Sequence, residues 1–254
     1  MGFPDTVGDS FLGFPADAVL VVTGGGSGIG KATVEEAARQ GLRVSAWDVN
    51  GAAVAEVAAT QRKAGHEVLD IAVDVTDEDA VQDAFVLTAT RLGPAGLLFN
   101  NAGPAQTTDM TFSAGIVATL GSVGLVTESW LDTPGSAQGS VVSTASVAGN
   151  IVAAGARSWY PAAKAGIGGY TRWLSVHRPN GIRANAILPG STETPRTIDD
   201  QRSAAGREHL ARNPLRRAGQ AVEIAAATLF LLSPTASYIN GALLVVDGGM
   251  TNVW

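Results

Sequence analysis

The sequence predicts an α/β fold, a single doubly wound domain in which helices flank a seven-stranded parallel sheet. Short apolar runs bounded by turn residues alternate with longer segments of helical spacing, which is the pattern of repeated βαβ units. The 254 residues are enough for one large buried core. No internal repeat or linker-like change of composition divides the chain. We therefore expect an irregular N-terminal arm over residues 1–16 and one domain over residues 17–254.

The expected strands are short apolar runs that end at turn residues. They cover residues 18–22, 43–47, 67–73, 96–100, 139–144, 182–187 and 242–246. The expected helices lie between them and place apolar residues three or four positions apart. They cover residues 28–40, 51–64, 77–92, 113–131, 158–177 and 221–232.

A glycine cluster joins the first expected strand to the first expected helix, within AVLVVTGGGSGIGKATVEEAARQG. Gly24, Gly28 and Gly30 follow the spacing G-x-x-x-G-x-G, which differs from the commoner G-x-G-x-x-G. Glycine permits positive φ and close backbone approach, and free N–H groups at a helix start attract phosphate. The cluster predicts a cradle for a dinucleotide pyrophosphate, with an ordinary tight turn as the alternative.

The second expected strand, within LRVSAWD, ends at Asp48, about twenty residues after the glycine loop. An acidic group at this place accepts hydrogen bonds from a ribose 2′-hydroxyl and repels a 2′-phosphate. The residue before Gly28 is Ser27, and the loop offers a 2′-phosphate no basic partner. We therefore predict NAD rather than NADP. A turn residue or cap at the strand end is the alternative for Asp48.

Tyr160 and Lys164 lie four residues apart in the run WYPAAKAG, so they share one face of a helix. Ser146 lies fourteen positions before Tyr160, at the end of an expected strand. A phenol beside an ammonium and a hydroxyl can move a proton on and off an alcohol oxygen when a hydride acceptor is adjacent. The alternatives are a plain surface pair on the helix and, for Ser146, a local backbone bond. Ser143 and Thr144 are nearby competitors for the serine role.

The proposed proton transfer sets a requirement on Tyr160. A free phenol titrates near pH 10, so its pKa must be lowered by roughly two to three units to act near neutrality. The Lys164 ammonium and the charge of an oxidised nicotinamide favour phenolate, so we predict a lowered pKa. We also expect Lys164 to bond the nicotinamide ribose and Ser146 to stabilise charge on the substrate oxygen.

The ordered set of motifs resembles the short-chain dehydrogenase/reductase family, of the classical type, from about Ala18 to Gly249. The motifs are TGGGSGIG (Thr23 to Gly30), Asp48, DV (Asp74 and Val75), NNAG (Asn100 to Gly103), STASVAG with Ser146, YPAAK with Tyr160 and Lys164, GIRANAILPG (Gly181 to Gly190), TETP with Thr194, and NGALLVVDGG. The resemblance implies a Rossmann-like fold and hydride transfer between a secondary alcohol and a ketone. It also implies a homodimer or homotetramer, in which the C-terminal segment packs against another subunit.

The resemblance further implies a complete cofactor site. Asp74 and Val75 would flank the adenine, and Thr194 would contact the carboxamide. The residues after the fourth expected strand would line the cofactor behind the ribose. The implied set is Gly24, Ser27, Gly28, Ile29, Gly30, Asp48, Asp74, Val75, Asn101, Ala102, Gly103, Tyr160, Lys164, Pro189, Gly190, Thr192 and Thr194.

One element of the family pattern is different here. Members usually carry an Asn in the helix before the serine strand, where it bends the helix and anchors a water of the proton relay. Matching this helix through Thr127 places Thr119 at the Asn position, whereas matching through Gly121 places Ala118 there. The departure motivates a rival hypothesis, a dinucleotide-binding sensor or assembly subunit without turnover. A third hypothesis is proton chemistry without net hydride transfer, such as dehalogenation or isomerisation.

Residues 195–217 break the regular alternation. They are charged and weakly periodic, and they follow directly after Thr194, so they are a candidate lid over the substrate cleft. A solvated surface excursion is the alternative. By sequence adjacency, the expected pocket neighbours suggest a neutral, partly apolar alcohol or ketone. They are Pro104, Val147, Ile151, Trp159 and Thr192. A core or cap role is the alternative for each of them.

Composition excludes several other classes. Net charge is −6, which disfavours nucleic acid, and the absence of cysteine excludes disulfides and thiolate metal sites. His66, His177 and His209 are far apart and follow no ligand spacing, so we expect no metal site. The N-terminal segment lacks the features of a signal peptide, and no apolar stretch is expected to reach the roughly eighteen residues of a membrane span. We expect a soluble cytoplasmic protein.

Overall fold

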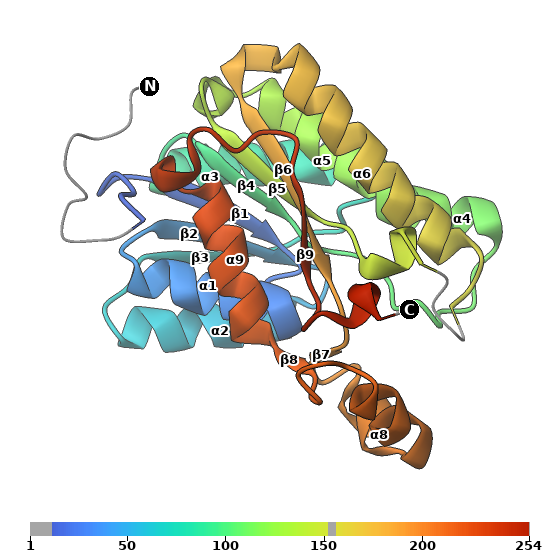
Figure 1. Cartoon of the computed structure of the whole chain (residues 1–254). Coiled ribbons are helices and arrows are strands. Elements are labelled where there is room, and N and C mark those ends of the chain that lie inside the picture. The colour runs from blue at the N-terminus through green and yellow to red at the C-terminus, as the bar shows by residue number, and fades with distance from the viewer. Residues whose placement is uncertain (1–11, 152–155, 254) are drawn as a thin grey trace.

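Seven strands pair in parallel in the order β3-β2-β1-β4-β5-β6-β9 in the computed structural model, which describes residues 12–151 and 156–253 (Figure 1). The strands are β1 (Val19–Thr23), β2 (Arg43–Asp48), β3 (Val68–Ala72), β4 (Leu97–Asn100), β5 (Ser140–Thr144), β6 (Arg183–Pro189) and β9 (Leu243–Val246). The chain winds outward from β1 in one direction and from β4 in the other. Doubly wound sheets bind their ligands in a crevice where the strand order reverses, and this point lies at the carboxyl ends of β1 and β4 here.

Helices cover both faces of this sheet (Figure 1). The α-helices are α1 (Gly28–Arg39), α2 (Gly51–Lys63), α3 (Glu78–Leu92), α4 (Phe112–Ile116), α5 (Ser122–Leu131), α6 (Trp159–His177), α7 (Ile198–Arg202), α8 (Ala204–Ala211) and α9 (Ala221–Leu232). A π-helix, η1 (Val117–Gly121), joins α4 to α5. The 3₁₀ turns are η2 (Pro134–Ser136), η3 (Val147–Gly149), η4 (Pro179–Gly181), η5 (Pro234–Ala236) and η6 (Met250–Asn252).

The core has two halves because successive residues of a strand point to opposite faces. Leu20 and Val22 of β1 pack with buried residues of α1, α2 and α9. Val19 and Val21 pack on the other face with buried residues of α3, α5 and α6. All five residues of β1 are buried, as expected for a central strand covered on both sides. This double burial explains the unbroken apolar run in the sequence.

The predicted fold class and the seven predicted strands are confirmed, with bounds within two residues of those expected. Five of the six predicted helices are also present as single α-helices. The prediction of one helix over 113–131 is wrong in detail, because the π-helix η1 interrupts it. Two short strands, β7 (Thr192–Glu193) and β8 (Gly219–Gln220), pair in parallel and were not expected.

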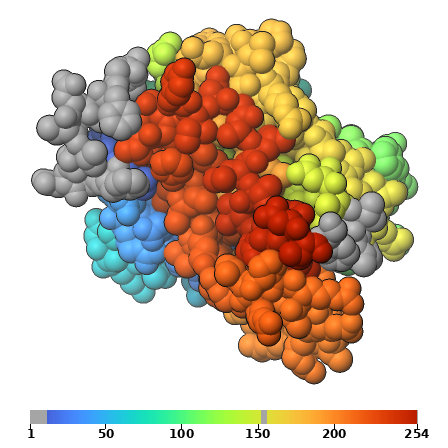
Figure 2. All heavy atoms as spheres, in the orientation of Figure 1, coloured from blue at the N-terminus to red at the C-terminus, as the bar shows by residue number. Residues whose placement is uncertain are grey.

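The charged segment 195–217 contains two short helices, α7 and α8. Figure 2 shows the surface around this segment as a lobe beside the C-terminal residues, and Asn213 Nδ2 ties the two regions by donating to Asp247 O at 2.7 Å. Its role as a lid stays a prediction. The expected N-terminal arm falls largely on residues 1–11, outside the described residues, and residues 12–16 form no helix or strand. The domain bounds also stay a prediction.

One segment, Phe112–Leu131, is long and apolar enough to cross a membrane by length and composition, which corrects the expectation that no stretch would reach that length. Core helices of soluble proteins satisfy the same criteria. Val123, Val126 and Trp130 of α5 are buried, the last two among sheet residues of the core. This part of the segment therefore packs as a core helix, and the cellular location stays a prediction.

Candidate active site

The glycine loop between β1 and α1 follows the carboxyl end of β1, where the strand order reverses. Gly24 has a φ of +69° and Gly28 a φ of +51°, values that side chains other than glycine rarely adopt. A Cβ on Gly30 would overlap the carbonyl oxygen of Gly24 and come within 2.7 Å of Asn101 Nδ2. Glycine is therefore required at Gly30 for the loop to close tightly onto the helix start.

The start of α1 is open to an anion. Ser27 is the N-cap residue, but its side chain makes no capping hydrogen bond. The N–H groups in the first turn of a helix have no intrahelical acceptor, and they carry the positive end of the helix dipole. Thr194 lies against this loop, because a Cβ on Gly28 would come 3.2 Å from Thr194 Cγ2. This loop has the free N–H donors that a pyrophosphate requires, and its role in binding one stays a prediction.

Asn101 has a structural task that the sequence did not reveal. Its backbone N–H and that of Ala102 donate to Thr23 Oγ1 at 2.9 and 3.0 Å. The Asn101 side chain donates from Nδ2 to Thr23 O at 3.2 Å. Its Oδ1 accepts from Thr144 Oγ1 at 3.3 Å. Asn101 thus ties the ends of β1, β4 and β5 together, and its predicted contact with the cofactor stays a prediction.

Asp48 holds the backbone around the glycine loop. Its Oδ2 accepts from Gly26 N at 2.9 Å, and its Oδ1 accepts from Asn50 N, also at 2.9 Å. The alternative role as a strand-end turn residue is therefore present in the structure. Each carboxylate oxygen has a second lone pair, so Asp48 can also accept a hydrogen bond from a ribose hydroxyl.

The remaining predicted cofactor residues lie at the carboxyl end of the sheet or in the loops that follow it. Asp74 Oδ1 accepts from the backbone and hydroxyl of Thr76 at 2.9 and 2.8 Å. Gly190, which follows β6, donates its N–H to Val246 O at 3.0 Å. Thr192 Oγ1 donates to Gly190 O at 3.1 Å. The other members of the predicted set at this end are Val75, Gly103 and Pro189, and Ile29 lies in the first turn of α1.

Lys164 is buried beside the other residues that are predicted to be catalytic. Only 8% of its surface is exposed, and its Nζ donates to Thr144 O at 2.6 Å. The same Nζ lies 5.7 Å from the centroid of the Tyr160 ring. Burial lowers the pKa of Lys164 to about 8, and the charge of Arg196 acts in the same direction. The predicted pairing of Tyr160 and Lys164 on one helix face is present in the structure.

The pKa of Tyr160 moves in the direction opposite to the one predicted. Burial of the phenol raises it, and this outweighs the side chain of Ser146 and the charge of Arg196, which lower it. The expectation of a lowered pKa is therefore wrong for the protein alone. Ser146 Oγ also accepts from Ala148 N at 3.1 Å, so the predicted local alternative for this serine exists beside its contact with Tyr160.

The buried ammonium of Lys164 predicts a pH dependence of stability. Its folded pKa of about 8 lies below its ordinary value of 10.5. Between these values the unfolded chain holds a proton that the folded chain has released, so stability rises with pH. We expect wild type to gain on the order of 2 kcal/mol relative to Lys164→Met between pH 8 and pH 10. Urea unfolding of both proteins across this range measures the difference.

Tyr160 and Tyr170 change stability with pH in the opposite direction. Both are present in wild type and in Lys164→Met, so their effect cancels in the difference between the two proteins. Burial raises the pKa of both phenols, that of Tyr170 to about 12, so their contribution to stability falls as pH rises above 10. Lys63→Met removes an exposed lysine from the last turn of α2 and is the matched control. A pH-independent difference between wild type and Lys164→Met would show that this ammonium carries no burial cost.

Thr119 occupies the middle of the π-helix η1 and faces inward. It is 1% exposed, and its hydroxyl has no hydrogen-bond partner among the described residues. Ser122 Oγ donates to the carbonyls of Ala118 and Thr119 at 3.0 and 3.1 Å. π-helical turns often mark functional sites, and a buried hydroxyl without a partner is a natural place for an ordered water. Of the two alignments left open, the structure places Thr119, not Ala118, in the interior.

Sequence adjacency suggested Trp159 as a neighbour of the substrate pocket, with a core role as the alternative. The structure shows the core role. It is 1% exposed and lies directly on Gly115, where any Cβ would overlap its ring. Its Nε1 has no hydrogen-bond partner among the described residues. The ring meets that of Tyr160 edge to face, with 5.6 Å between centroids. Trp159 therefore helps to fix the position of the Tyr160 ring through this contact.

Arg196 lies at this site but is not among the residues predicted from the sequence. Its Nη1 donates to Gly103 O at 3.2 Å, and its charge acts on both Tyr160 and Lys164. The contact joins residues 93 positions apart. The only signal in the sequence was its place two residues after Thr194, at the start of the expected lid.

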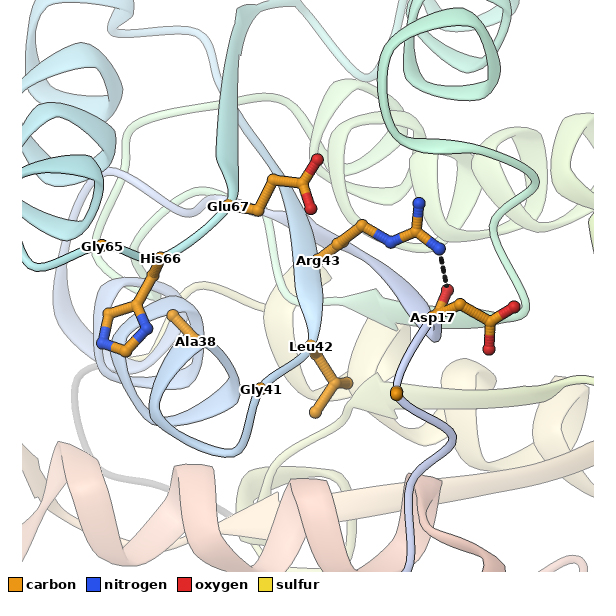
Figure 3. A pocket seen from close by; sticks show the side chains of 9 residues that line it. Asp17, Ala38, Gly41, Leu42, Arg43, Gly65, His66 and Glu67 are labelled. Atoms are coloured by element: carbon orange, nitrogen blue, oxygen red, sulfur yellow. Dashed lines mark hydrogen bonds between the residues drawn. The ribbon is translucent and has the colours of Figure 1, made fainter.

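A hollow of about 500 Å³ lies at the opposite end of the sheet (Figure 3). Its lining includes Asp17, His66 and Glu67 beside Arg43, the first residue of β2. Arg43 Nη2 donates to Asp17 O at 2.7 Å, and Nη1 donates to Leu92 O, also at 2.7 Å. None of the predicted site residues borders this hollow, so it is separate from the crevice.

The chain is similar to known oxidoreductases along nearly its whole length. A family model described as "Enoyl-(Acyl carrier protein) reductase" matches residues 24–251. Levodione reductase of Leifsonia aquatica is 37% identical over 253 residues, covering 92% of this chain and 94% of the relative. Cis-4-hydroxycyclohexanecarboxylate dehydrogenase of Sinomonas cyclohexanicum is 37% identical over 250 residues, covering 94% and 98%.

Solved structures agree with these relatives. The crystal structure of levodione reductase aligns with a TM-score of 0.86 at 36% identity, covering 94% of this chain and 99% of the other. A short chain dehydrogenase from Burkholderia cenocepacia in complex with NADP aligns with a TM-score of 0.85 at 29% identity, covering 92% and 98%.

Proposed function

This chain belongs to the short-chain dehydrogenase/reductase family, whose members bind a nicotinamide dinucleotide, and we propose that it is an NAD-dependent enzyme that interconverts a secondary alcohol and a ketone. The observation that carries the proposal is the placement of Tyr160 and Lys164 beside Ser146, near the glycine cradle at the carboxyl end of the sheet. Relatives named for the reduction of levodione or the oxidation of a hydroxycyclohexanecarboxylate support chemistry at a CH–OH group.

Each member of this set has a distinct task in the proposed reaction. In alcohol oxidation, Tyr160 Oη as phenolate takes the proton from the alcohol hydroxyl. Ser146 Oγ donates a hydrogen bond to the same oxygen, and the Lys164 ammonium stabilises the phenolate. The nicotinamide, when bound, supplies the acceptor or donor of the hydride. In ketone reduction, Tyr160 returns the proton to the oxygen.

The raised pKa of Tyr160 bears on the direction of the reaction. Burial keeps the phenol protonated near neutral pH in the protein alone, which suits proton donation to a ketone. Alcohol oxidation requires further positive charge near the phenol, and an oxidised nicotinamide carries such a charge. We therefore expect alcohol oxidation to have the more alkaline pH optimum.

Thr119 takes the place of the missing Asn in the proposed proton relay. Its buried hydroxyl has no hydrogen-bond partner in the part of the chain that the structure describes, so it would hold a water, and the π-helix widens the backbone at this position. The water would lead the proton from Tyr160 and Lys164 toward solvent. A backbone carbonyl of the same turn is the alternative anchor.

The cofactor preference rests on Asp48. Its carboxylate lies at the end of β2 and contacts the loop that would hold the pyrophosphate, so it would accept a bond from the ribose 2′-hydroxyl and repel a 2′-phosphate. We expect wild type to bind NAD at least about tenfold more tightly than NADP, and we expect Asp48→Ser to remove most of this preference. Fluorescence titration with both reduced dinucleotides measures the ratio.

The control for this experiment is Asp74→Ser, which removes a turn carboxylate after the next strand and should leave the ratio unchanged. Unfolding curves of both variants separate the loss of the Gly26 and Asn50 contacts from the loss of specificity. Equal affinity of wild type for the two dinucleotides would reject NAD as the preferred cofactor.

The reaction itself is tested with a panel of secondary alcohols and cyclic ketones, monitored by the absorbance of reduced dinucleotide. The panel includes levodione and 4-hydroxycyclohexanecarboxylate, because relatives are named for them. Turnover on any member with the expected dinucleotide supports the proposal. Tight dinucleotide binding without turnover across the panel would favour the rival role as a sensor, which the replacement of Asn by Thr119 motivates.

We also propose that the protein works as a homodimer or homotetramer. Support comes from large apolar side chains that the single chain leaves exposed on neighbouring helices. Val117 of η1 is 58% exposed, and Trp173 and Val176 of α6 are 52% and 77% exposed. A second copy of the chain would remove such surface from water.

A further inference from the structure

We propose that Arg196 is the anion-binding group of the substrate pocket, so that the preferred substrate is a secondary alcohol or ketone that also carries a carboxylate. The inference rests on the oxidoreductase function proposed above and names the class of its substrate. It departs from the neutral substrate that the sequence suggested.

Arg196 is an exposed residue whose charge acts on the two residues proposed to move the proton. The residue follows Thr194 on the segment after β7, and its Nη1 donates to Gly103 O in the loop after β4 at 3.2 Å. Its guanidinium therefore bridges two segments that start at the carboxyl end of the sheet. It is close enough to act electrostatically on both Tyr160 and Lys164.

The guanidinium has hydrogen-bonding capacity left over. Other arginines of the described chain pair with carboxylates, among them Arg157 with Asp109 at 3.0 Å and Arg217 with Glu223 at 2.7 Å. No ion pair of Arg196 with any described residue lies within 4.0 Å. The contact with Gly103 uses one of its five N–H groups. The rest of the fork matches the two oxygens of a carboxylate.

The positive charges of Arg196 and Lys164 together favour a bound anion. Burial is the larger cause of the lowered pKa of Lys164, and the charge of Arg196 lowers it further because the two cations repel each other. A bound carboxylate would offset the repulsion between the two cations. The chain as a whole carries a net charge of −6, so its general field repels acidic substrates. A local cation at the reacting end of the crevice is what such a substrate requires.

Two other roles for Arg196 predict different behaviour. If it only closes the loop through Gly103, its loss affects charged and neutral substrates alike. If it binds a phosphate of the dinucleotide, its loss weakens dinucleotide binding. Its effect on the pKa of Tyr160 also acts equally on all substrates. Only a subsite for the substrate changes the preference for an acid over its neutral amide.

The test compares 3-hydroxybutanoate and 3-hydroxycyclohexanecarboxylate with their primary carboxamides. The proteins are wild type, Arg196→Gln, Arg196→Lys and the control Arg202→Gln, which removes an exposed arginine of α7 on the same segment. In wild type we expect kcat/KM for the better acid to exceed that of its amide by about tenfold or more. The ratio should fall to about one in Arg196→Gln, fall in part in Arg196→Lys, and persist in Arg202→Gln.

Calorimetric titration of the same acids and amides into the complex with reduced dinucleotide provides a binding measurement that does not need turnover. Equal preference for acid and amide in wild type, binding of neither, or an unchanged ratio in Arg196→Gln would overturn the subsite. Weaker dinucleotide binding in Arg196→Gln with the ratio retained would overturn it as well. Turnover of neutral alcohols without a preference for acids would reject the carboxylate subsite and leave the proposed function in place. Dinucleotide binding without turnover of any alcohol would reject the proposed function.

Discussion

Tyr160→Phe is expected to lower kcat/KM for alcohol oxidation by roughly a thousandfold, while dinucleotide binding stays within about twofold of wild type. The change removes only the hydroxyl that would accept the proton from the alcohol. The ring remains, so its edge-to-face contact with Trp159 and its place near Lys164 are preserved. Steady-state rates and a dinucleotide titration measure the two quantities separately.

Tyr170→Phe is the matched control for this variant. Tyr170 lies on the same helix and is also partly buried, with a pKa raised to about 12 by burial and by the charge of Glu128. It stacks on Trp173 at 6.4 Å and is not part of the predicted site. Its loss should leave kcat/KM within about twofold of wild type, as for a change remote from the reacting groups. If Tyr160→Phe keeps wild-type turnover, another group moves the proton.

Gly30→Ala is expected to disrupt the glycine cradle. The added methyl group would meet the Gly24 carbonyl oxygen and the Asn101 side chain, and neither can retreat without moving the ends of β1 and β4. We expect a loss of about 3 kcal/mol in the free energy of unfolding and at least a tenfold loss in dinucleotide affinity. Urea unfolding and dinucleotide titration measure these losses.

Gly169→Ala provides the comparison for Gly30→Ala. Gly169 is an exposed residue within α6, and a Cβ there meets nothing within 4 Å. Alanine is the better helix former, so this variant should be more stable by about 0.5–1 kcal/mol and should bind dinucleotide normally. Wild-type stability and affinity in Gly30→Ala would show that the loop does not need a glycine there.

The sheet and most of its helices could be predicted because burial leaves a strong periodic signal. A central strand such as Val19–Thr23 is covered on both faces and must be apolar throughout. Helices such as Gly28–Arg39 are covered on one face and keep an apolar stripe. The motifs at the ends of the strands could also be located, since a parallel sheet brings its carboxyl ends to one edge.

The features that the sequence did not reveal depend on contacts between distant segments or on small backbone changes. The π-helix Val117–Gly121 has no periodic signature that separates it from an α-helix. The helices of the 195–217 segment bury few apolar side chains, so periodicity was weak, although Ser203 caps α8 by accepting from Gly206 N at 3.0 Å. That serine was a signal available in the sequence.

The direction of the pKa shift of Tyr160 also could not be predicted from the sequence. The sequence placed a cation four residues away, which lowers a phenol pKa, but burial decides the direction in the folded chain. Arg196 could not be placed at the site either, because only folding brings it to Gly103. The sequence left two candidates, Thr119 and Ala118, for the position of the usual Asn. The structure distinguishes them because Thr119 is buried on the inward face of the π-helix.

Transfer of deuterium from the carbinol carbon of a substrate to the nicotinamide ring is the direct test of whether this protein moves a hydride. A secondary alcohol from the panel, deuterated at that carbon, is incubated with the enzyme and oxidised dinucleotide, and the reduced dinucleotide is analysed by mass spectrometry. We expect one deuterium in the reduced dinucleotide formed by wild type, and almost no reduced dinucleotide with Tyr160→Phe. Product formation without deuterium in the dinucleotide, or equal transfer by the variant, would contradict it.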